Sequence, residues 1–493
     1  MAVSSTFKQF DFGYADSGSE FSIAPRLLRD GYYDLDGIEE KVVDSHEFLL
    51  LGYKGSGKSA IGARLQVRAE GAPSQFAAHD PILVDSLPLK EFKGIVPDSI
   101  DAHLRHRFAW MLQLMVQITS GINDDGQADA KSRKRIAAAC RQLAKHGVTA
   151  QNPATMKKFR AEKVTATAGL PEGAIGLPAN IKAEFQRNTD ASRISDWVDY
   201  LQTETAGFKS QRRHYFFVDG LDDLSLIQEG RKEMLGGLIQ AVVDLNKMYR
   251  EAGAPIKVVI CCRTDLYARL ELTRGGKIQS DYGLDLNWYQ NPRDFRVSHL
   301  VKLANMRARL ADRSSSNVFD EYFEPRIDSD AAIDFILKQT RHTPRDLLQL
   351  LKIIQKHVGA SGVIPNDSTK AGIAEYSQTY FIGEMRDALS AYFDQDQITA
   401  IATLLGTLRR RQVSYGELEA KMESDPRFRE RFDLHKAIAA LFDNSFIGNL
   451  TEGGPVSAYD QYYRFKFRNP HAALAVEDKL VVHPGLWKAF SIA

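Results

Sequence analysis

A glycine-rich run near the start of the chain has the residue types that bind phosphate: Gly52-Tyr53-Lys54-Gly55-Ser56-Gly57-Lys58-Ser59. Its glycines allow a tight turn whose backbone N–H groups point inward, toward phosphate oxygens. Lys58 can neutralise the β- and γ-phosphates of a nucleotide, and the Ser59 hydroxyl can ligate Mg²⁺. The spacing is the P-loop pattern, which predicts a site for ATP with Mg²⁺. The predicted contacts are Gly52, Lys54, Gly55, Ser56, Gly57, Lys58, Ser59 and Ala60.

Three carboxylates lie directly after a second stretch whose pattern predicts structure. Residues 214–218 are mostly apolar and indicate a buried parallel strand, with Asp219 at its carboxyl tip. In open α/β sheets this tip faces the ligand, so we expect Asp219 to hold Mg²⁺ together with Ser59. Asp222 and Asp223 come next on the loop. Either could orient or deprotonate an attacking water, and the residues alone do not decide between them.

Apolar runs and helical patterns predict the strands and the helix that carry the glycine-rich loop and the carboxylates. Residues 48–51 indicate a strand that leads into the glycine-rich loop, and a helix beginning at Lys58 would turn its positive dipole end toward phosphate. Residues 256–262 indicate a further buried strand that ends in polar residues. The fold class predicted from this order is α/β, with a parallel sheet of the P-loop NTPase type.

Four parts are expected along the chain. The parts are an N-terminal segment packing on the ATPase core (1–47), a P-loop ATPase domain (48–300) with a helical insertion at about 121–195, a helical lid (301–392), and a winged-helix domain (393–493). The tyrosines of the first part, which include Tyr14 and the pair Tyr32 and Tyr33, are candidates to lie over an adenine ring. Within the lid, Thr343 is expected to cap a helix that begins at Pro344, which puts Arg345 in the first turn.

Composition narrows the class of protein. The chain has 493 residues, 44% of them hydrophobic, and a net charge of +1, which argues neither for nor against a nucleic-acid partner. The three cysteines show no zinc or disulfide spacing. No apolar leader and no run long enough to span a membrane is present. We therefore expect a soluble, cytoplasmic protein with no membrane partner.

Two stretches resemble known ATPase families. Residues 216–223, FFVDGLDD, resemble the extended Walker B motif of NACHT-type proteins, with Asp223 where those proteins usually have Glu. Residues 341–348 are similar to the sensor 2 region of origin-recognition-type ATPases and to the Gly-x-Pro element of STAND proteins, with His342 in place of the glycine. Together with the order of parts, the chain resembles STAND and AAA+-like bacterial ATPases, a group with members in defence against phage.

That resemblance implies further roles for single residues. It implies an ASCE-type strand order, a sensor 1 residue at Thr264 or Arg263, and a γ-phosphate sensor at Arg345. Arg269 and Arg274 are candidates for arginine fingers in a neighbouring subunit, although surface salt bridges are the commoner role for such residues.

The predicted function is ATP binding and slow hydrolysis by a switch or assembly ATPase. Lids of this kind couple the nucleotide to the arrangement of domains. The expected partners are other copies of the chain or a separate effector protein. One alternative is a DNA-binding, origin-loader-like ATPase, whose turnover would respond to DNA and to salt. Two others are a small-molecule kinase and a scaffold that binds ATP with little turnover.

Overall fold

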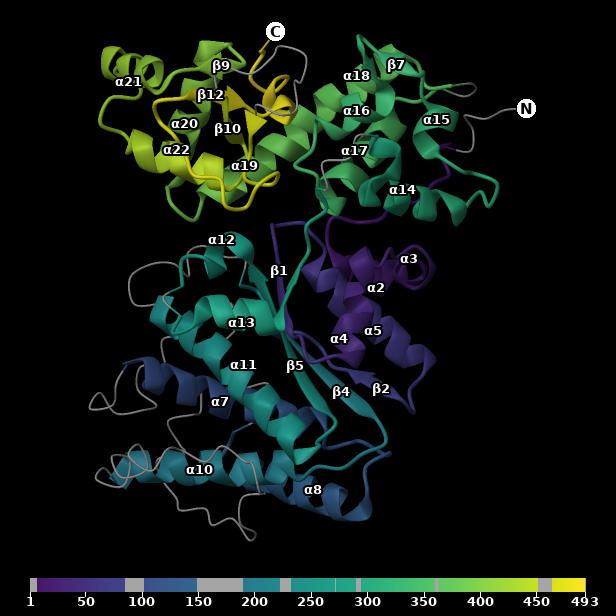
Figure 1. Cartoon of the computed structure of the whole chain (residues 1–493), viewed down its shortest axis with the longest axis vertical. Helices are drawn as coiled ribbons and strands as arrows, with labels where there is room; N and C mark the ends of the chain where they lie inside the picture. Colours follow the sequence, from purple (N-terminus) through teal and green to yellow (C-terminus); the bar gives the residue numbers. More distant parts are fainter. Residues whose placement is uncertain are drawn as a thin grey trace. The chain divides into compact units, whose positions relative to one another are not determined.

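The computed structural model describes residues 7–84, 102–148, 189–221, 232–270, 272–289, 294–359, 363–450 and 463–492 (Figure 1). The chain divides into two compact units. The sheet unit comprises Glu40–Leu51 and Leu65–Leu284, and the lid unit comprises Met1–Glu39, Gly52–Arg64 and Asp285–Ala493. The predicted phosphate loop therefore belongs to the lid unit. Within the described ranges, no helix combines the length and hydrophobicity needed to cross a membrane.

A six-stranded parallel sheet gives the protein its mixed α/β class, as the sequence predicts at this coarser level. Its strands are β1 (Leu49–Gly52), β2 (Phe76–Ala78), β3 (Ile82–Leu83), β4 (Arg213–Asp219), β5 (Ile256–Arg263) and β6 (Gly283–Asp285). They lie in the order β2-β4-β5-β1-β6, with β3 paired to β4. Residues 214–218 of β4 are all buried, as expected for a strand covered on both faces. In the parallel register Val218 is opposite Ile260.

Helices of the sheet unit pack on one another through a mostly apolar core. They are α7 (Ala102–Gly121), α8 (Ala130–Lys145), α10 (Thr189–Ala206), α11 (Lys232–Ala252), α12 (Thr264–Tyr267) and α13 (Gly275–Tyr282), while α4 (Ile38–Asp44) and α5 (Lys58–Gly71) each begin in the lid unit. Figure 1 shows α7, α8 and α10 grouped together. α7 and α11 approach closely at Gly237, where an added Cβ would lie 2.8 Å from the His106 Cβ. The described part of the predicted insertion is helical, and residues 149–188 lie outside the described residues.

The lid unit is largely helical after residue 298. Its helices between residues 298 and 389 are α14 (His299–Arg309), α15 (Val318–Tyr322), α16 (Ala332–Leu337), α17 (Pro344–Lys356), α18 (Asn366–Glu375), η6 (Tyr376–Phe381) and α19 (Ile382–Leu389). The N-terminal aromatic residues pack on them, because the Phe7 ring lies 5.7 Å from Tyr322 and 5.5 Å from Phe323. In the short helix α2 (Ser17–Ile23), Glu20 accepts hydrogen bonds from the buried Arg307 of α14 at 2.6 and 2.9 Å.

The C-terminal part combines three helices with a small antiparallel sheet. Its elements are α20 (Gln395–Leu408), β9 (Gln412–Val413), α21 (Tyr415–Ser424), α22 (Leu434–Asp443), β10 (Ile447–Leu450), β11 (Tyr463–Arg464) and β12 (Lys479–Val482). The sheet order is β11-β10-β12-β9. β10 pairs with both β11 and β12.

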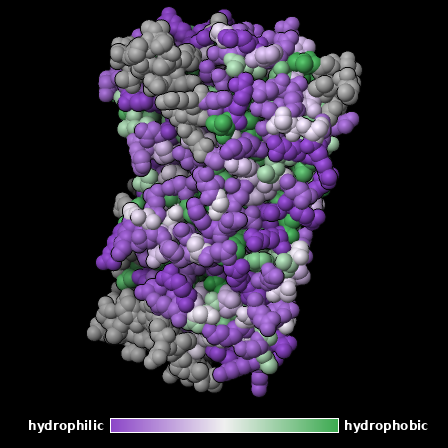
Figure 2. Space-filling model, turned by 45° about the vertical axis from the view of Figure 1, so that its right-hand side comes forward, coloured by the Kyte–Doolittle hydropathy of each residue, from purple (hydrophilic) through white to green (hydrophobic). Residues whose placement is uncertain are grey.

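Surface hydropathy reveals no extended apolar patch on the face drawn in Figure 2, where hydrophobic residues are scattered among hydrophilic ones. The large hydrophobic side chains exposed in the described ranges are Ile23, Leu83, Val297, Val363 and Val476. Isolated residues of this kind are normal on protein surfaces.

Candidate phosphate-binding site

The glycine-rich loop connects β1 to α5 as the sequence predicts. β1 ends at Gly52 and α5 begins at Lys58. Gly55 and Gly57 have φ angles of +84° and +96°, a left-handed region that favours glycine. At Gly57 an added Cβ would meet no atom within 4 Å, so this side of the loop is open. The residue types are therefore needed by the turn itself.

Polar groups of the loop are consistent with a bound polyphosphate. Lys58 is only 4% exposed, and its Nζ donates to the carbonyl oxygens of Gly52 and Tyr53 at 3.1 Å each. The Ser56 hydroxyl is buried and has no hydrogen-bond partner among the described residues. A buried ammonium and an unpaired hydroxyl beside an open turn are suited to an anion, because buried polar groups are normally hydrogen-bonded.

The first turn of α17 lies against this loop within the lid unit. Thr343 is the N-cap, its Oγ1 accepting from the Asp346 N–H at 3.2 Å, and Pro344 is the first helical residue. The Arg345 N–H donates to the Gly55 carbonyl oxygen at 3.4 Å. A Cβ added to Gly55 would lie 3.1 Å from the Arg345 Cβ and 3.3 Å from the Thr343 Oγ1. The predicted cap and the predicted position of Arg345 are both confirmed, and α17 touches the loop directly.

A buried ion pair fixes the start of α17. Asp346 accepts from the Arg341 Nε and Nη2 at 2.9 Å each, from the Arg341 backbone N–H at 3.0 Å and from the Tyr380 hydroxyl at 3.2 Å. Burial alone would raise the pKa of Asp346, but the charge of Arg341, together with the hydrogen bonds from its guanidinium and backbone N–H, brings the pKa below its usual value. Asp346 is therefore committed to Arg341. Among the described residues Arg345 has no ion-pair partner.

His342 lies between these two arginines in the sequence. Its φ of +51° is in the left-handed region, where glycine would be unstrained. Its ring is buried and stacks on Phe467 at 5.2 Å. Burial, helped by the charge of Arg468, lowers the pKa of His342 to about 3, so the ring is neutral.

Side chains of the loop also contact later parts of the lid unit. The Lys54 ammonium lies 3.4 Å from Glu384 and 3.6 Å from Asp387 of α19. The Tyr53 hydroxyl donates to the Lys466 carbonyl oxygen at 2.7 Å, and the Trp288 Nε1–H donates to the Ser56 carbonyl oxygen at 2.8 Å. Glu384 also accepts from Arg341 at 3.1 Å. Sequence reasoning missed Trp288, Glu384 and Lys466, because no local pattern marks them.

The predicted residues of the sheet unit lie at the carboxyl ends of adjacent strands. Asp219 ends β4, and its carboxylate accepts from the Gly220 N–H at 2.8 Å. Thr264 is the first residue after β5. Arg263 is buried and bonds to Asp265 at 2.8 and 2.9 Å, which leaves Thr264 as the better sensor candidate. Asp222 and Asp223 lie outside the described residues.

The predicted Mg²⁺ site would have few ligands from the protein. In the described part of the chain, no three His, Cys, Asp or Glu side chains come together in a way that could hold a metal ion. Mg²⁺ at phosphate sites is typically bound by one or two protein groups, with phosphate oxygens and water completing the shell. Ser59 and Asp219 are residue types that fit this pattern.

Comparison with known protein families finds a match within the lid unit. Residues 298–382 match a family model described as the FunZ-associated C-terminal helical domain. The matched segment runs from the N-cap of α14 to the start of α19 and includes Arg341, Arg345 and Asp346. A search of curated proteins found no match.

Proposed function

We propose that the chain is a Mg²⁺-dependent ATPase in which the state of the γ-phosphate sets the position of the lid helices. The observation that carries this proposal is the contact between the loop at Gly55 and the first turn of α17 at Thr343 and Arg345. Arg345 lies next to the loop, and Asp346, its nearest acidic neighbour in the sequence, is bonded to Arg341. A γ-phosphate would supply the missing partner, and ADP would not.

Individual roles follow from residue chemistry. Lys58 would bind the β- and γ-phosphates. Ser59 and Asp219 would hold Mg²⁺, whose positive charge would stabilise the negative charge on the phosphate oxygens during hydrolysis. Asp222 or Asp223 would take a proton from water as it attacks the γ-phosphorus, while the bond to the bridging oxygen breaks and ADP leaves. Thr264 would orient that water. Tyr33 lies 6.2 Å from Trp288, which bonds the loop, so Tyr33 is a better candidate than Tyr32 to cover the adenine.

The wider assignment is of a STAND or AAA+-like ATPase with an ASCE-type P-loop core and a C-terminal winged helix. A parallel sheet in which β5 separates β4 from β1 is compatible with such a core. The helix–strand–helix–helix–strand order after Gln395 is compatible with a winged helix. A nucleotide-dependent lid suits a switch or assembly ATPase that acts as a homo-oligomer or on a separate effector, including one in phage defence.

DNA binding by the C-terminal part receives less support. This part of the chain contains the basic run Arg409-Arg410-Arg411, a residue type that can bind phosphate. Arg410 pairs with Glu417 at 2.8 Å, and the Arg411 guanidinium lies 4.2 Å from the Trp487 ring centre. Two of the three cations are thus engaged within the protein, which makes them weaker phosphate ligands.

Nucleotide titrations test the proposal. Calorimetry of the full chain should give Mg²⁺-dependent ATP binding that Lys58→Ala weakens by 2–3 kcal/mol or more, the value of a charged contact to phosphate, roughly 30- to 150-fold. Lys131→Ala, an exposed position at the start of α8, is the matched control. Equal affinity of wild type and Lys58→Ala would refute the site.

Phosphate release separates binding from catalysis. We expect Asp223→Asn to slow turnover by roughly 10²- to 10⁴-fold while leaving ATP affinity nearly unchanged, with Asp222→Asn as the alternative base. If neither substitution slows turnover and Asp219→Asn does, the role assigned to the two loop carboxylates is wrong.

A further inference from the structure

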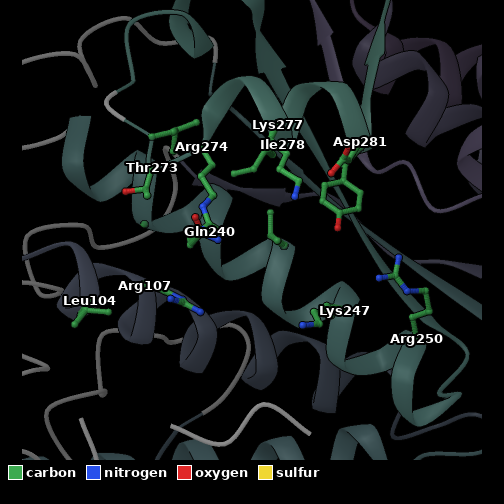
Figure 3. A pocket seen from close by; sticks show the side chains of 15 residues that line it. Leu104, Arg107, Gln240, Lys247, Arg250, Thr273, Arg274, Lys277, Ile278 and Asp281 are labelled. Atoms are coloured by element: carbon green, nitrogen blue, oxygen red, sulfur yellow. The ribbon is translucent and has the colours of Figure 1, made fainter. Parts of the chain in front are cut away.

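A groove of about 590 Å³ lies along α11 in the sheet unit, and none of its lining residues belongs to the glycine-rich loop. α7, α11, α13 and the loop before α13 line it (Figure 3). In Figure 3 Arg274 and Lys277 come from the α13 side, Lys247 and Arg250 from α11, and Arg107 from α7. Its volume is in the range of small-molecule sites.

The charges in this groove are unbalanced. Five of its lining residues are cationic (Arg107, Lys247, Arg250, Arg274 and Lys277) and only Asp281 is acidic. Two cations have partners, because Arg107 bonds to the buried Asp244 and Lys247 lies 3.8 Å from Glu251. Arg250, Arg274 and Lys277 have no side-chain ion pair or hydrogen bond with any described residue. Three cations without ion-pair partners that line one hollow, with a single acid among the lining residues, favour an anionic ligand.

The remainder of the lining combines the polar residues Gln240 and Thr273 with apolar residues and two glycines. Val243, Leu272, Ile278 and Tyr282 contribute side chains, and Gly236 contributes none. Helix packing explains Gly237, whose Cβ would meet the backbone nitrogen of Arg107 at 2.9 Å. It does not explain Gly236, whose Cβ would meet only Leu272 at 3.5 Å. Because glycine weakens a helix interior, its presence there is more readily explained by the space that it leaves in the groove.

We propose that this groove binds a small ligand with two or more phosphate groups on an aromatic or apolar body, the chemical class of nucleotides. The cations without partners would hold the phosphates, and the apolar wall with Tyr282 would contact the body. A nucleic-acid strand shares this chemistry but would extend beyond a hollow of nucleotide size. The groove is therefore a second phosphate site, independent of the loop at residues 52–59.

The test uses the full chain in the Lys58→Ala background, which weakens binding of ATP at the loop. Calorimetry with ATP and with inorganic triphosphate should show binding, and the double variant Arg250→Gln/Lys277→Gln should weaken it at least 10-fold for each cation removed. Arg133→Gln/Lys134→Gln, two exposed cations of α8, gives the same charge change in the same unit. This control should bind as the parent does.

A second variant tests the shape of the groove without altering charge. Gly236→Ala should fold normally, since the added Cβ meets only ordinary contact, and should weaken ATP more than inorganic triphosphate. Failure of both probes to bind at millimolar concentration overturns the proposal, as does an equal decrease in the control variant. Tighter binding of a 12-residue oligothymidylate, abolished in the groove variant, would assign the groove to a strand instead. If the loop does not bind nucleotide, these outcomes still test the groove, because Gly236, Arg250 and Lys277 line the groove and lie outside the loop.

Discussion

Cationic side chains gather in two regions of this molecule, at the start of α17 in the lid unit and along the groove of the sheet unit, and their partners differ. In the lid unit Arg341 bonds to Asp346 and Glu384, and Lys54 pairs with Glu384. In the groove, Arg250, Arg274 and Lys277 have no acidic partner among the described residues. Buried charges require partners to be tolerated, whereas exposed ones such as Arg250, Arg274 and Lys277 can remain available for a ligand.

Arg345 lies in the lid unit, but it resembles the groove cations in having no acidic partner among the described residues. Its backbone is fixed by the N-cap of α17, while its guanidinium has no acidic partner in the described ranges. The comparison therefore separates cations that hold the fold together from cations that are positioned to bind. Substitutions in the first class should affect stability, and substitutions in the second should affect affinity.

The largest expected effect is on the buried pair. Asp346→Ala should lower the free energy of unfolding by about 3–5 kcal/mol, because it leaves the Arg341 guanidinium buried without its main counter-charge. Urea unfolding of the full chain measures this change. Asp387→Ala removes a mostly exposed partner of Lys54 and should lower it by less than about 1 kcal/mol. Similar decreases in the two variants would contradict the distinction between buried cations that stabilise the fold and exposed ones that do not.

The next effect concerns pH in the same region. Burial lowers the pKa of His342 and of His483 to about 3, so each ring stays neutral in the folded chain while it would be protonated near pH 6.5 when unfolded. The unfolded state binds more protons between these values, so stability should fall as the pH drops from 6.5 toward 3. At pH 5 the decrease is about 2 kcal/mol for each histidine.

Urea unfolding midpoints measured between pH 7.5 and pH 5 test how steeply the stability falls with decreasing pH. His342→Asn tolerates the left-handed backbone and should reduce the slope. His435→Asn, at an exposed position of α22, is the control and should leave the slope unchanged. A slope identical in wild type and His342→Asn would show that this histidine is not held neutral by burial.

Local patterns explain which parts of the site the sequence could predict. The loop glycines, Lys58 and the cap at Thr343 each depend on neighbours within a few residues, so their spacing carries the information. The apolar runs likewise predicted β4 and β5, since a strand buried on both faces has few polar residues. The predicted roles of Asp222 and Asp223 stay predictions.

Interactions across long stretches of sequence were not predictable in this way. Trp288 and Lys466 reach the loop from 232 and 413 residues away, and nothing in their local sequence distinguishes them. The groove combines residues from three helices that are separated in sequence, and Arg274 was considered only as a possible arginine finger. The excess of positive charge there is visible only when these helices are brought together, because the net charge of the whole chain is +1.

The smallest expected effect concerns Arg345 and tests its place in the comparison. One charged hydrogen bond to the γ-phosphate is worth about 2 kcal/mol, or roughly 30-fold in affinity, and a nucleotide can shift the lid only through such a difference between ATP and ADP. Arg345→Ala should therefore weaken binding of a non-hydrolysable ATP analogue by about that factor and leave ADP affinity unchanged. Arg386→Ala, an exposed arginine on α19, should change neither. Because Asp346 is bonded to Arg341, removal of a pair with Asp346 cannot explain the effect, and unfolding of Arg345→Ala should match wild type. An unchanged ratio of ATP to ADP affinity, or a decrease in stability comparable to that of Asp346→Ala, would place Arg345 among the structural cations instead.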